Sequence, residues 1–318
     1  MAALPAWREL PDEQRELLFA CALLHDVAKP ACTRYDPDGR LSSRGHAWRG
    51  AIRARAILWR LGVPFAQREA VCAIIRFHLV PFFLIENDNP RRTALEVSQT
   101  ARCDWLSIMA EADARGRICP DPQRLLDNIA LFREQALEEG CLTAPYEFPN
   151  PHGRVLYFRD PLRQPDSPAY EDFRCHVVVL SGLPGAGKDH WLSHHLAGWP
   201  VLSLDEIRTE LGVSPAEQQG EVLQLARERA REYLRAGINF VWNATNLSRT
   251  VRGECLRLFY DYNAHVRLVY LEATPEKLFA QNRERKRQVP ERVIERLLER
   301  WEVPDRTEAH EVDYVLGE

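Results

Sequence analysis

The feature that most constrains this chain is a glycine-rich segment, Gly182-Leu183-Pro184-Gly185-Ala186-Gly187-Lys188. It has the spacing G-x-x-x-x-G-K and lies between an apolar run, Val177 to Leu180, and a stretch of helical character. In this setting backbone N–H groups turn inward around a phosphate chain, the helix N-terminus adds a favourable dipole, and the lysine reaches the same oxygens. An ordinary glycine-rich turn needs neither the strand nor the lysine, so the segment predicts a phosphate-binding loop.

The residue after the lysine departs from the usual pattern. Such loops commonly carry a serine or threonine there, whose hydroxyl holds Mg²⁺, whereas this chain has Asp189. A carboxylate could hold Mg²⁺ directly or through water, but its charge beside phosphates could also weaken binding, and both alternatives stay open. The loop predicts ATP or another NTP with Mg²⁺, bound by Gly182, Leu183, Pro184, Gly185, Ala186, Gly187, Lys188 and Asp189.

The hydrophobic pattern divides the chain into three parts. Residues 1–144 have helical periodicity, which predicts an all-α domain. Residues 145–173 hold six prolines and one strand-like piece, Arg154 to Phe158, and are typical of a linker. In residues 174–318 short apolar strands alternate with helical stretches, which predicts an α/β domain with a parallel sheet. The first helix is expected to begin at Pro11, and further helices are expected over His46–Leu61, Ala66–Leu79, Arg92–Arg115 and Pro122–Glu139. The expected strands are Val177–Leu180, Val201–Leu204, Phe240–Trp242 and Val266–Leu271.

The composition excludes several classes of protein. The longest apolar neighbourhood, Val71 to Ile85, is interrupted by Arg76 and Pro81, so no membrane partner is expected. The N-terminus lacks the layout of a signal peptide, which leaves the cytoplasm as the expected compartment. The eight cysteines form no close pairs, which argues against a disulfide framework. Because the net charge is −4, a nucleic-acid partner would need a local basic patch.

A carboxylate and an arginine follow the second expected strand, in Asp205-Glu206-Ile207-Arg208. Ligands of open α/β sheets bind at the carboxyl ends of the strands, where Asp205 could take a proton from an attacking hydroxyl. Arg208, one turn later, could grip a nearby phosphate. A capping aspartate with a solvated arginine is the better interpretation of the pair alone, but the preceding loop favours a functional one. Further on, Arg283, Arg285 and Arg287 form either a solvated helix face or a lid that neutralises the transferring phosphate.

Together these motifs resemble the polynucleotide 5′-kinase family, from about Val177 to the end of the chain. The resemblance implies that Lys188 binds phosphates, that Asp205 is the general base for a 5′-hydroxyl, and that Arg208 contacts the adjacent nucleic-acid phosphate. It also implies that one or more of Arg283, Arg285 and Arg287 belong to the lid. Relatives often carry aspartate where this chain has Asn243.

Histidines and aspartates recur near the ends of successive expected helices in the first part of the chain: His25, Asp26, His46, His78 and Asp113. Three imidazoles and two carboxylates so distributed can converge on a metal centre in a helical core. Any one of them alone is better explained as a core histidine or a capping aspartate, but the ordered set with Lys29 favours the metal centre. Only four of the 42 basic residues are lysine, which suggests that chemistry requires the Lys29 ammonium.

The ordered set resembles the HD phosphohydrolase superfamily over about Leu17 to Arg117, and Asp113-Ala114-Arg115-Gly116-Arg117 brings it close to the HD domain of bacterial tRNA nucleotidyltransferases. The resemblance implies one metal site formed by His25, Asp26 and Asp113 and a second formed by Asp26, His46 and His78, with Lys29 binding substrate phosphate and Arg49 as a further candidate. The usual upstream histidine has no counterpart in residues 1–24, so a single metal at the second site is an alternative. Mn²⁺, Ni²⁺, Co²⁺ and similar divalent ions suit these ligands.

The whole chain resembles bacterial RNA end-healing proteins in which an HD phosphoesterase is fused to a polynucleotide kinase. Broken RNA often ends in a 2′,3′-cyclic phosphate on one side and a 5′-hydroxyl on the other. We expect the first domain to remove 2′,3′-cyclic phosphate and 3′- or 2′-phosphate ends, and the second to phosphorylate 5′-hydroxyl ends of RNA or DNA, with an RNA ligase as a downstream partner. Two alternatives stay open: an HD nucleotidase fused to a small-molecule kinase, and an ATP-gated non-catalytic module with a decayed metal site.

Overall fold

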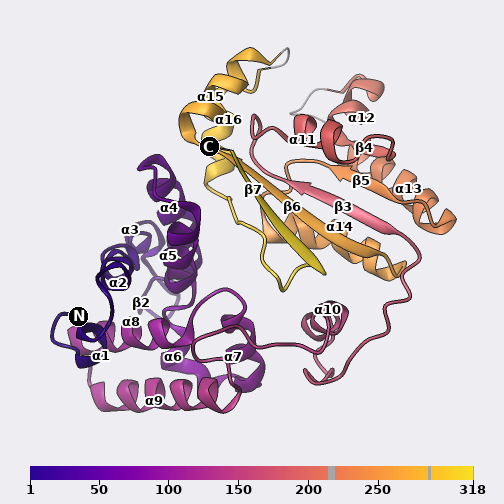
Figure 1. Cartoon of the computed structure of the whole chain (residues 1–318). Coiled ribbons are helices and arrows are strands. Elements are labelled where there is room, and N and C mark those ends of the chain that lie inside the picture. The colour runs from indigo at the N-terminus through magenta and orange to yellow at the C-terminus, as the bar shows by residue number, and fades with distance from the viewer. Residues whose placement is uncertain (214–218, 286–287, 318) are drawn as a thin grey trace. The chain divides into compact units, whose positions relative to one another are not determined.

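The structure is a computed structural model that describes residues 1–213, 219–285 and 288–317. The chain divides into two compact units, Met1–Glu147 and Phe148–Glu318. The expected order, a helical part followed by an α/β part, is confirmed (Figure 1). In the described part of the chain no helix is both long and apolar enough to cross a membrane.

The first unit is built almost entirely of helices (Figure 1). In chain order its elements are α1 (Pro5–Arg8), α2 (Asp12–Leu24), α3 (Lys29–Cys32), β1 (Arg34–Tyr35), β2 (Leu41–Ser42), α4 (His46–Arg60), α5 (Phe65–Phe77), α6 (Val80–Phe83), the 3₁₀ helix η1 (Leu84–Glu86), α7 (Pro90–Ser98), α8 (Cys103–Gly116) and α9 (Pro122–Glu138). The short antiparallel hairpin β1–β2 was not expected from the sequence. Leu18 of α2, Ile75 of α5 and Leu106 of α8 are fully buried in one core, which fixes the ends of these helices relative to one another.

The single helix expected over Arg92–Arg115 is wrong, because α7 and α8 are separate. The residues at the break bind the chain that follows α9. The Gln99 side-chain amide donates to the Tyr146 carbonyl at 3.0 Å, and the Asp104 backbone N–H donates to the Leu142 carbonyl at 2.9 Å. These tertiary hydrogen bonds outweigh the local helical periodicity.

The second unit holds a five-stranded parallel sheet in the order β4-β5-β3-β6-β7. Its strands are β3 (His176–Ser181), β4 (Val201–Ser203), β5 (Phe240–Asn243), β6 (His265–Ala273) and β7 (Glu311–Gly317). Its helices are α10 (Pro151–Arg159), α11 (Lys188–His195), α12 (Leu204–Leu211), α13 (Gln219–Ala236), α14 (Arg249–Asp261), α15 (Pro275–Glu284) and α16 (Glu291–Leu298). The four expected strands are confirmed.

Alternate residues of β3 pack on opposite faces of this sheet. Val177 and Val179 join a core with Phe259 of α14, whereas Val178 and Leu180 join a core with Trp191 of α11. Helices therefore cover both faces, as a parallel sheet requires. This burial explains why the strands are continuous apolar runs in the sequence.

The strand-like piece expected over Arg154–Phe158 is wrong, because these residues lie in helix α10. Asn150 caps the helix by accepting from the Gly153 N–H at 2.8 Å, and Pro151 occupies its first turn. Arg154 then donates to the carbonyls of Ala309 and His310. Part of the expected linker of residues 145–173 is thus bound to the second unit.

Candidate functional site

Asp26, His46 and His78 form a compact group in the first unit, with one potential ligand atom from each within 4.8 Å of the others. Each residue lies next to the end of a helix, as the sequence predicts. His46 opens α4, and His78 directly follows α5. Gly50 allows α4 to approach the end of α2, because a Cβ there would lie 3.4 Å from the His25 carbonyl oxygen and 3.3 Å from Ile75.

The two histidine rings of this group and the neighbouring His25 ring all bind a backbone carbonyl through the same nitrogen. The Nδ1 atoms of His25, His46 and His78 lie 2.8, 2.8 and 2.7 Å from the backbone carbonyls of Ala22, Ser43 and Ile75. A carbonyl only accepts, so Nδ1 carries a proton, and in the neutral ring Nε2 keeps its lone pair. This arrangement fixes each ring for metal binding through Nε2.

Two observations fit a divalent metal at this point. The Nε2 atoms of His46 and His78 face each other at 3.2 Å, which brings two lone pairs together when both rings are neutral. The Oδ1 atom of Asp26 is buried without a hydrogen-bond donor and lies 3.4 Å from His46 Nε2. A cation between these atoms would satisfy all three groups, and imidazole with carboxylate suits the first-row divalent ions.

The charge state of the group also suits a cation. Burial lowers the pKa of His78 to about 4, which keeps this ring neutral at physiological pH. Burial alone would raise the pKa of Asp26, but the hydrogen bond from Lys29 at 2.6 Å and the positive charge of that ammonium contribute to lowering it. Asp26 is therefore a carboxylate, and Lys29 places an ammonium at the edge of the group.

The two other predicted ligands lie beside this group. His25 Nε2 is 3.2 Å from Asp26 Oδ2 and 3.9 Å from Asp113 Oδ1. Asp113 also accepts from Arg117 at 2.5 Å, which turns one of its oxygens away from His25. The five sequence-predicted residues therefore converge, with Asp26, His46 and His78 closest together. Sequence reasoning assigned no role to Arg117, although its spacing of four residues from Asp113, at the C-terminal cap of α8, is a signal for such a pair.

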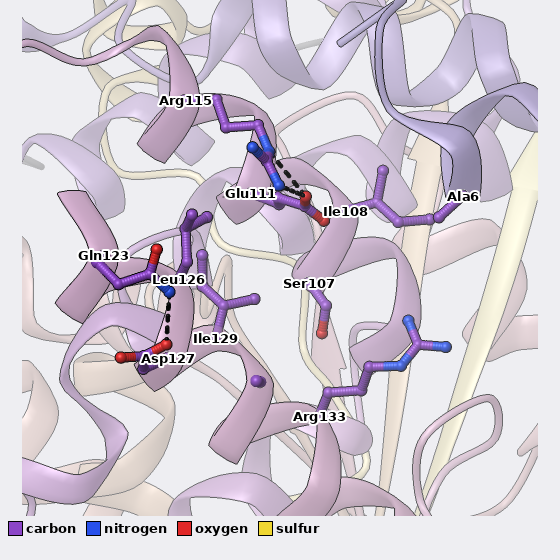
Figure 2. Close-up of a pocket in the computed structure, with 11 residues that line it drawn as sticks. Ala6, Ser107, Ile108, Glu111, Arg115, Gln123, Leu126, Asp127, Ile129 and Arg133 are labelled. Carbon is purple, nitrogen blue, oxygen red and sulfur yellow. Dashed lines mark hydrogen bonds and ion pairs between the residues drawn. The ribbon is translucent and has the colours of Figure 1, made fainter.

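A separate groove lies between α8 and α9 and is lined by Ser107, Glu111, Arg115, Asp127 and Arg133 among others (Figure 2). Residues two apart on a helix point about 200° apart, so this groove faces away from Asp113. Two polar pairs lie within the groove, Arg115 with Glu111 and Gln123 with Asp127 (Figure 2). The groove therefore adds no group to the metal centre.

In the second unit the glycine loop follows β3 and leads into α11. Gly182 has φ +153°, and a Cβ there would lie 2.4 Å from the Leu271 carbonyl oxygen. Gly185 has φ +87°, and its Cβ would lie 2.9 Å from the Leu278 carbonyl oxygen. Only glycine fits at both places, so the loop folds into the open curve that a phosphate chain occupies.

Lys188 closes this loop by donating to the carbonyls of Gly182 and Leu183 at 2.9 and 3.0 Å. Burial lowers the pKa of Lys188 to about 8, although the carboxylates of Asp189 and Asp205 oppose this shift. A phosphate chain in the loop would bring the negative charge that stabilises the ammonium. The cradle thus fits a polyphosphate.

Asp189 and Asn243, the two departures from the usual sequence pattern, meet in the structure. The Asn243 amide at the carboxyl end of β5 donates to Asp189 Oδ1 at 2.9 Å. One carboxylate oxygen is therefore held by a neutral partner. The carboxylate lies in the first turn of the helix that begins at Lys188, at the position expected for a Mg²⁺ ligand.

Asp205 lies in the first turn of α12, directly after β4. It is not the cap of this helix, because Ser203 accepts from the Glu206 N–H in that role. Its side chain is 75% exposed and accepts a hydrogen bond from Arg208. A carboxylate at the end of a strand that is neither buried nor used as a cap can accept a substrate proton.

The arginine run lies at the end of α15. Arg283 is exposed in the last turn of this helix, and Arg285 is the residue that follows it. Burial is the main cause of the lowered pKa of Lys188, and the positive charge of Arg285 adds to this lowering, whereas Asp189 opposes it. Arg285 therefore acts on the phosphate cradle. Arg287, the third residue of the expected lid, lies outside the described residues.

Comparison with protein families identifies two domains. Residues 2–109 match the HD domain, and residues 177–304 match the AAA domain. A CC-adding tRNA nucleotidyltransferase of Thermus thermophilus is 43% identical over 74 residues, which cover 23% of this chain and 16% of that protein. An A-adding tRNA nucleotidyltransferase of Deinococcus radiodurans is 35% identical over 138 residues, which cover 42% of this chain and 31% of that protein. The chain thus spans less than a third of these curated relatives.

Two solved structures are similar to the chain at low identity. One is a protein described as a kinase from Chloroflexus aurantiacus, with 16% identity, a TM-score of 0.36, and coverage of 46% of this chain and 86% of that one. The other is a sugar kinase from Janibacter, with 17% identity, a TM-score of 0.35, and coverage of 45% of this chain and 85% of that one.

Proposed function

We propose that this protein, which carries an HD domain followed by an AAA-type P-loop domain, repairs both ends of broken RNA so that they can be joined. The HD part removes 2′,3′-cyclic phosphate and 3′- or 2′-phosphate ends, and the P-loop part phosphorylates 5′-hydroxyl ends. The observation that carries the proposal is the presence on one chain of a histidine–aspartate cluster and a phosphate cradle. The curated relatives are named for their action on tRNA, which supports RNA as the polymer.

In the HD part Asp26, His46 and His78 would hold a divalent metal ion, such as Mn²⁺, Ni²⁺ or Co²⁺. When bound, such an ion supplies a Lewis acid and a water of lowered pKa. Lys29, held by Asp26, presents its ammonium to a non-bridging oxygen of the substrate phosphate. His25 and Asp113 stand beside the group and would complete a second metal site if two ions bind.

In the P-loop part the backbone of residues 182–188 and the Lys188 ammonium would hold the phosphates of ATP or another NTP. Asp189 would face the Mg²⁺ ion that accompanies the nucleotide. Asp205 accepts the proton of the 5′-hydroxyl as its oxygen attacks the γ-phosphorus, and the bond to the β-phosphate oxygen breaks with departure of the nucleoside diphosphate. Arg208 binds the nucleic-acid phosphate beside that hydroxyl, and Arg283 and Arg285 neutralise the transferring group.

The products of both reactions fit a downstream RNA ligase, because a 3′-hydroxyl and a 5′-phosphate are the ends that such an enzyme joins. The proposal is tested by supplying labelled ATP with either a 5′-hydroxyl RNA oligonucleotide or free nucleosides and sugars. We expect label on the oligonucleotide alone. Label on the small molecules with none on RNA or DNA would replace the proposal by a metabolite kinase fused to an HD nucleotidase.

A further inference from the structure

Arg117 is a cation near the metal-binding group to which the proposed function assigns no role. That group consists of Asp26, His46 and His78. The Arg117 guanidinium donates to Asp113 Oδ2 at 2.5 Å and lies over the ring of Phe82, 5.1 Å from the ring centre. Phe82 is fully buried, and the Arg117 backbone N–H is bound to the last turn of α8. The guanidinium is therefore held in place from three sides.

A row of polar contacts connects Arg117 with Lys29. From Arg117 the row passes through Asp113, His25 and Asp26, and successive members are 2.5, 3.9, 3.2 and 2.6 Å apart. The Arg117 and Lys29 side chains at its two ends are 32% and 39% exposed. The Asp113 and His25 side chains between them are only 12% and 17% exposed. Both cations are therefore open to a ligand that arrives from solvent.

A second metal ion does not fit the Asp113 side of this row. An ion held by three protein atoms needs all of them close to one point. Among the described residues one set of three histidine, cysteine or acidic side chains brings its ligand atoms within 4.8 Å of one another, and this set is the metal-binding group. His25 and Asp113 lie outside it, and residues 1–24 hold no histidine that could complete a second set. Arg117 already balances the charge of Asp113.

We propose that the HD site holds one divalent ion and that Arg117 takes the place of a second ion by binding the substrate phosphate together with Lys29. This inference rests on the proposed function. Two cations at the ends of one row match a ligand with several negative oxygens. Arginine suits this role because it stays charged and its planar fork can bind two phosphate oxygens at once. Among the described residues Asp113 alone accepts from its guanidinium, through one nitrogen, so the other two nitrogens keep their donors for the phosphate.

The first test counts the metal ions of the full-length protein. Protein stripped with EDTA and free of nucleotide is titrated with Mn²⁺, and binding is followed by electron paramagnetic resonance. Ions that Asp26→Ala abolishes belong to the HD site. We expect one such ion per chain, and Asp113→Asn should retain it. Two such ions in the parent, or loss of an ion in Asp113→Asn, would overturn the proposal, because Asp113 would then be a metal ligand.

The second test measures how inorganic phosphate binds beside the Mn²⁺ ion, from the broadening that the bound ion causes in the phosphorus NMR signal. Arg117→Gln should weaken phosphate binding about 10- to 100-fold, because a hydrogen bond between charged groups contributes at this scale. Arg115→Gln is the matched control. Arg115 forms an ion pair of the same spacing with Glu111 on α8 but lines the groove that faces away from Asp113 (Figure 2). This variant should bind phosphate like the parent.

The double variant Asp113→Asn/Arg117→Gln guards against a fold defect, because it leaves no unpaired carboxylate at this position. It should lose phosphate binding as Arg117→Gln does and keep its one ion. Parent-like phosphate binding in the double variant, or an equal loss in Arg115→Gln, would overturn the proposal and leave a purely structural ion pair. If the parent binds Mn²⁺ and phosphate as expected but removes no phosphate from RNA ends, the proposed function fails while the assignment of Arg117 stands.

Discussion

Exchanging the partners of the Asp189–Asn243 hydrogen bond tests how the P-loop part holds its metal. The Asn243 amide nitrogen and Asp189 Oδ1 are 2.9 Å apart. Asn243→Asp would place two carboxylates at this separation, a repulsion of about 1.4 kcal/mol in bulk water and about 6 kcal/mol at an effective dielectric of 20. Because Asp189 is exposed but Asn243 is buried, we expect a cost between these two values. Asp189→Ser alone would leave neither residue 189 nor residue 243 with a carboxylate to hold Mg²⁺.

The double variant Asp189→Ser/Asn243→Asp restores a hydroxyl on the loop and a carboxylate on the strand, as in ordinary P-loops. We expect each single variant to lose about 10- to 100-fold in the Mg²⁺-dependent part of ATP affinity, and the double variant to recover most of it. The measurement is calorimetric titration with ATP, in Mg²⁺ and in EDTA, which requires no catalytic turnover. Mn²⁺ binding followed by electron paramagnetic resonance gives an independent count of the metal.

Glu221→Gln provides the control for a lost negative charge, because this residue lies exposed in the first turn of α13 in the same unit. Its Mg²⁺-dependent affinity should match that of the parent. A double variant that binds MgATP as weakly as Asn243→Asp would refute the idea that the two positions share one function. An Asp189→Ser variant that binds MgATP as tightly as the parent would refute the same idea.

Three other variants or conditions test the account. Asp205→Ala should reduce 5′-phosphorylation by roughly 10²- to 10⁴-fold with little change in ATP affinity, and near-normal turnover in that variant would remove Asp205 from the mechanism. Gly182→Ala should abolish ATP binding in titrations because its Cβ meets the Leu271 carbonyl, and retained binding would show that the loop can open. Burial lowers the pKa of His310 to about 3, so its proton uptake opposes folding: stability should be flat above pH 6.5 and fall by up to about 1.4 kcal/mol per pH unit below it. Thermal melts of the parent and of His310→Gln between pH 7.5 and 5 measure this, and equal acid sensitivity would contradict the assignment.

The order of the domains and the convergence of the HD residues could be predicted from the sequence for a physical reason. His25, His46 and His78 lie at helix ends, and the ends of packed helices meet at one place in a bundle. The glycine loop was predictable because only glycine allows its backbone conformation. The spacing of residues along the sequence was therefore enough to predict these two sites, because their chemistry requires that spacing.

The features that could not be predicted from the sequence depend on contacts between segments far apart in the chain. Strand β7 is an edge strand with mixed polarity, so it lacks the apolar run that marks β3. Helix α10 is held by carbonyls of Ala309 and His310, more than 150 residues later. The bond between Asn243 and Asp189 joins two positions that the sequence presents as unrelated departures. No local pattern contains such information.

The most direct test of the central claim uses one RNA oligonucleotide with a 5′-hydroxyl and a 2′,3′-cyclic phosphate, supplied with ATP, Mg²⁺ and Mn²⁺ and analysed by mass spectrometry. The parent protein should process both ends. Asp26→Ala removes the carboxylate of the metal-binding group and should leave the cyclic phosphate intact while 5′-phosphorylation continues. Lys188→Ala removes the ammonium of the phosphate cradle and should do the reverse. If either substitution silenced both ends in a protein still folded by circular dichroism, the account of two independent sites would be contradicted.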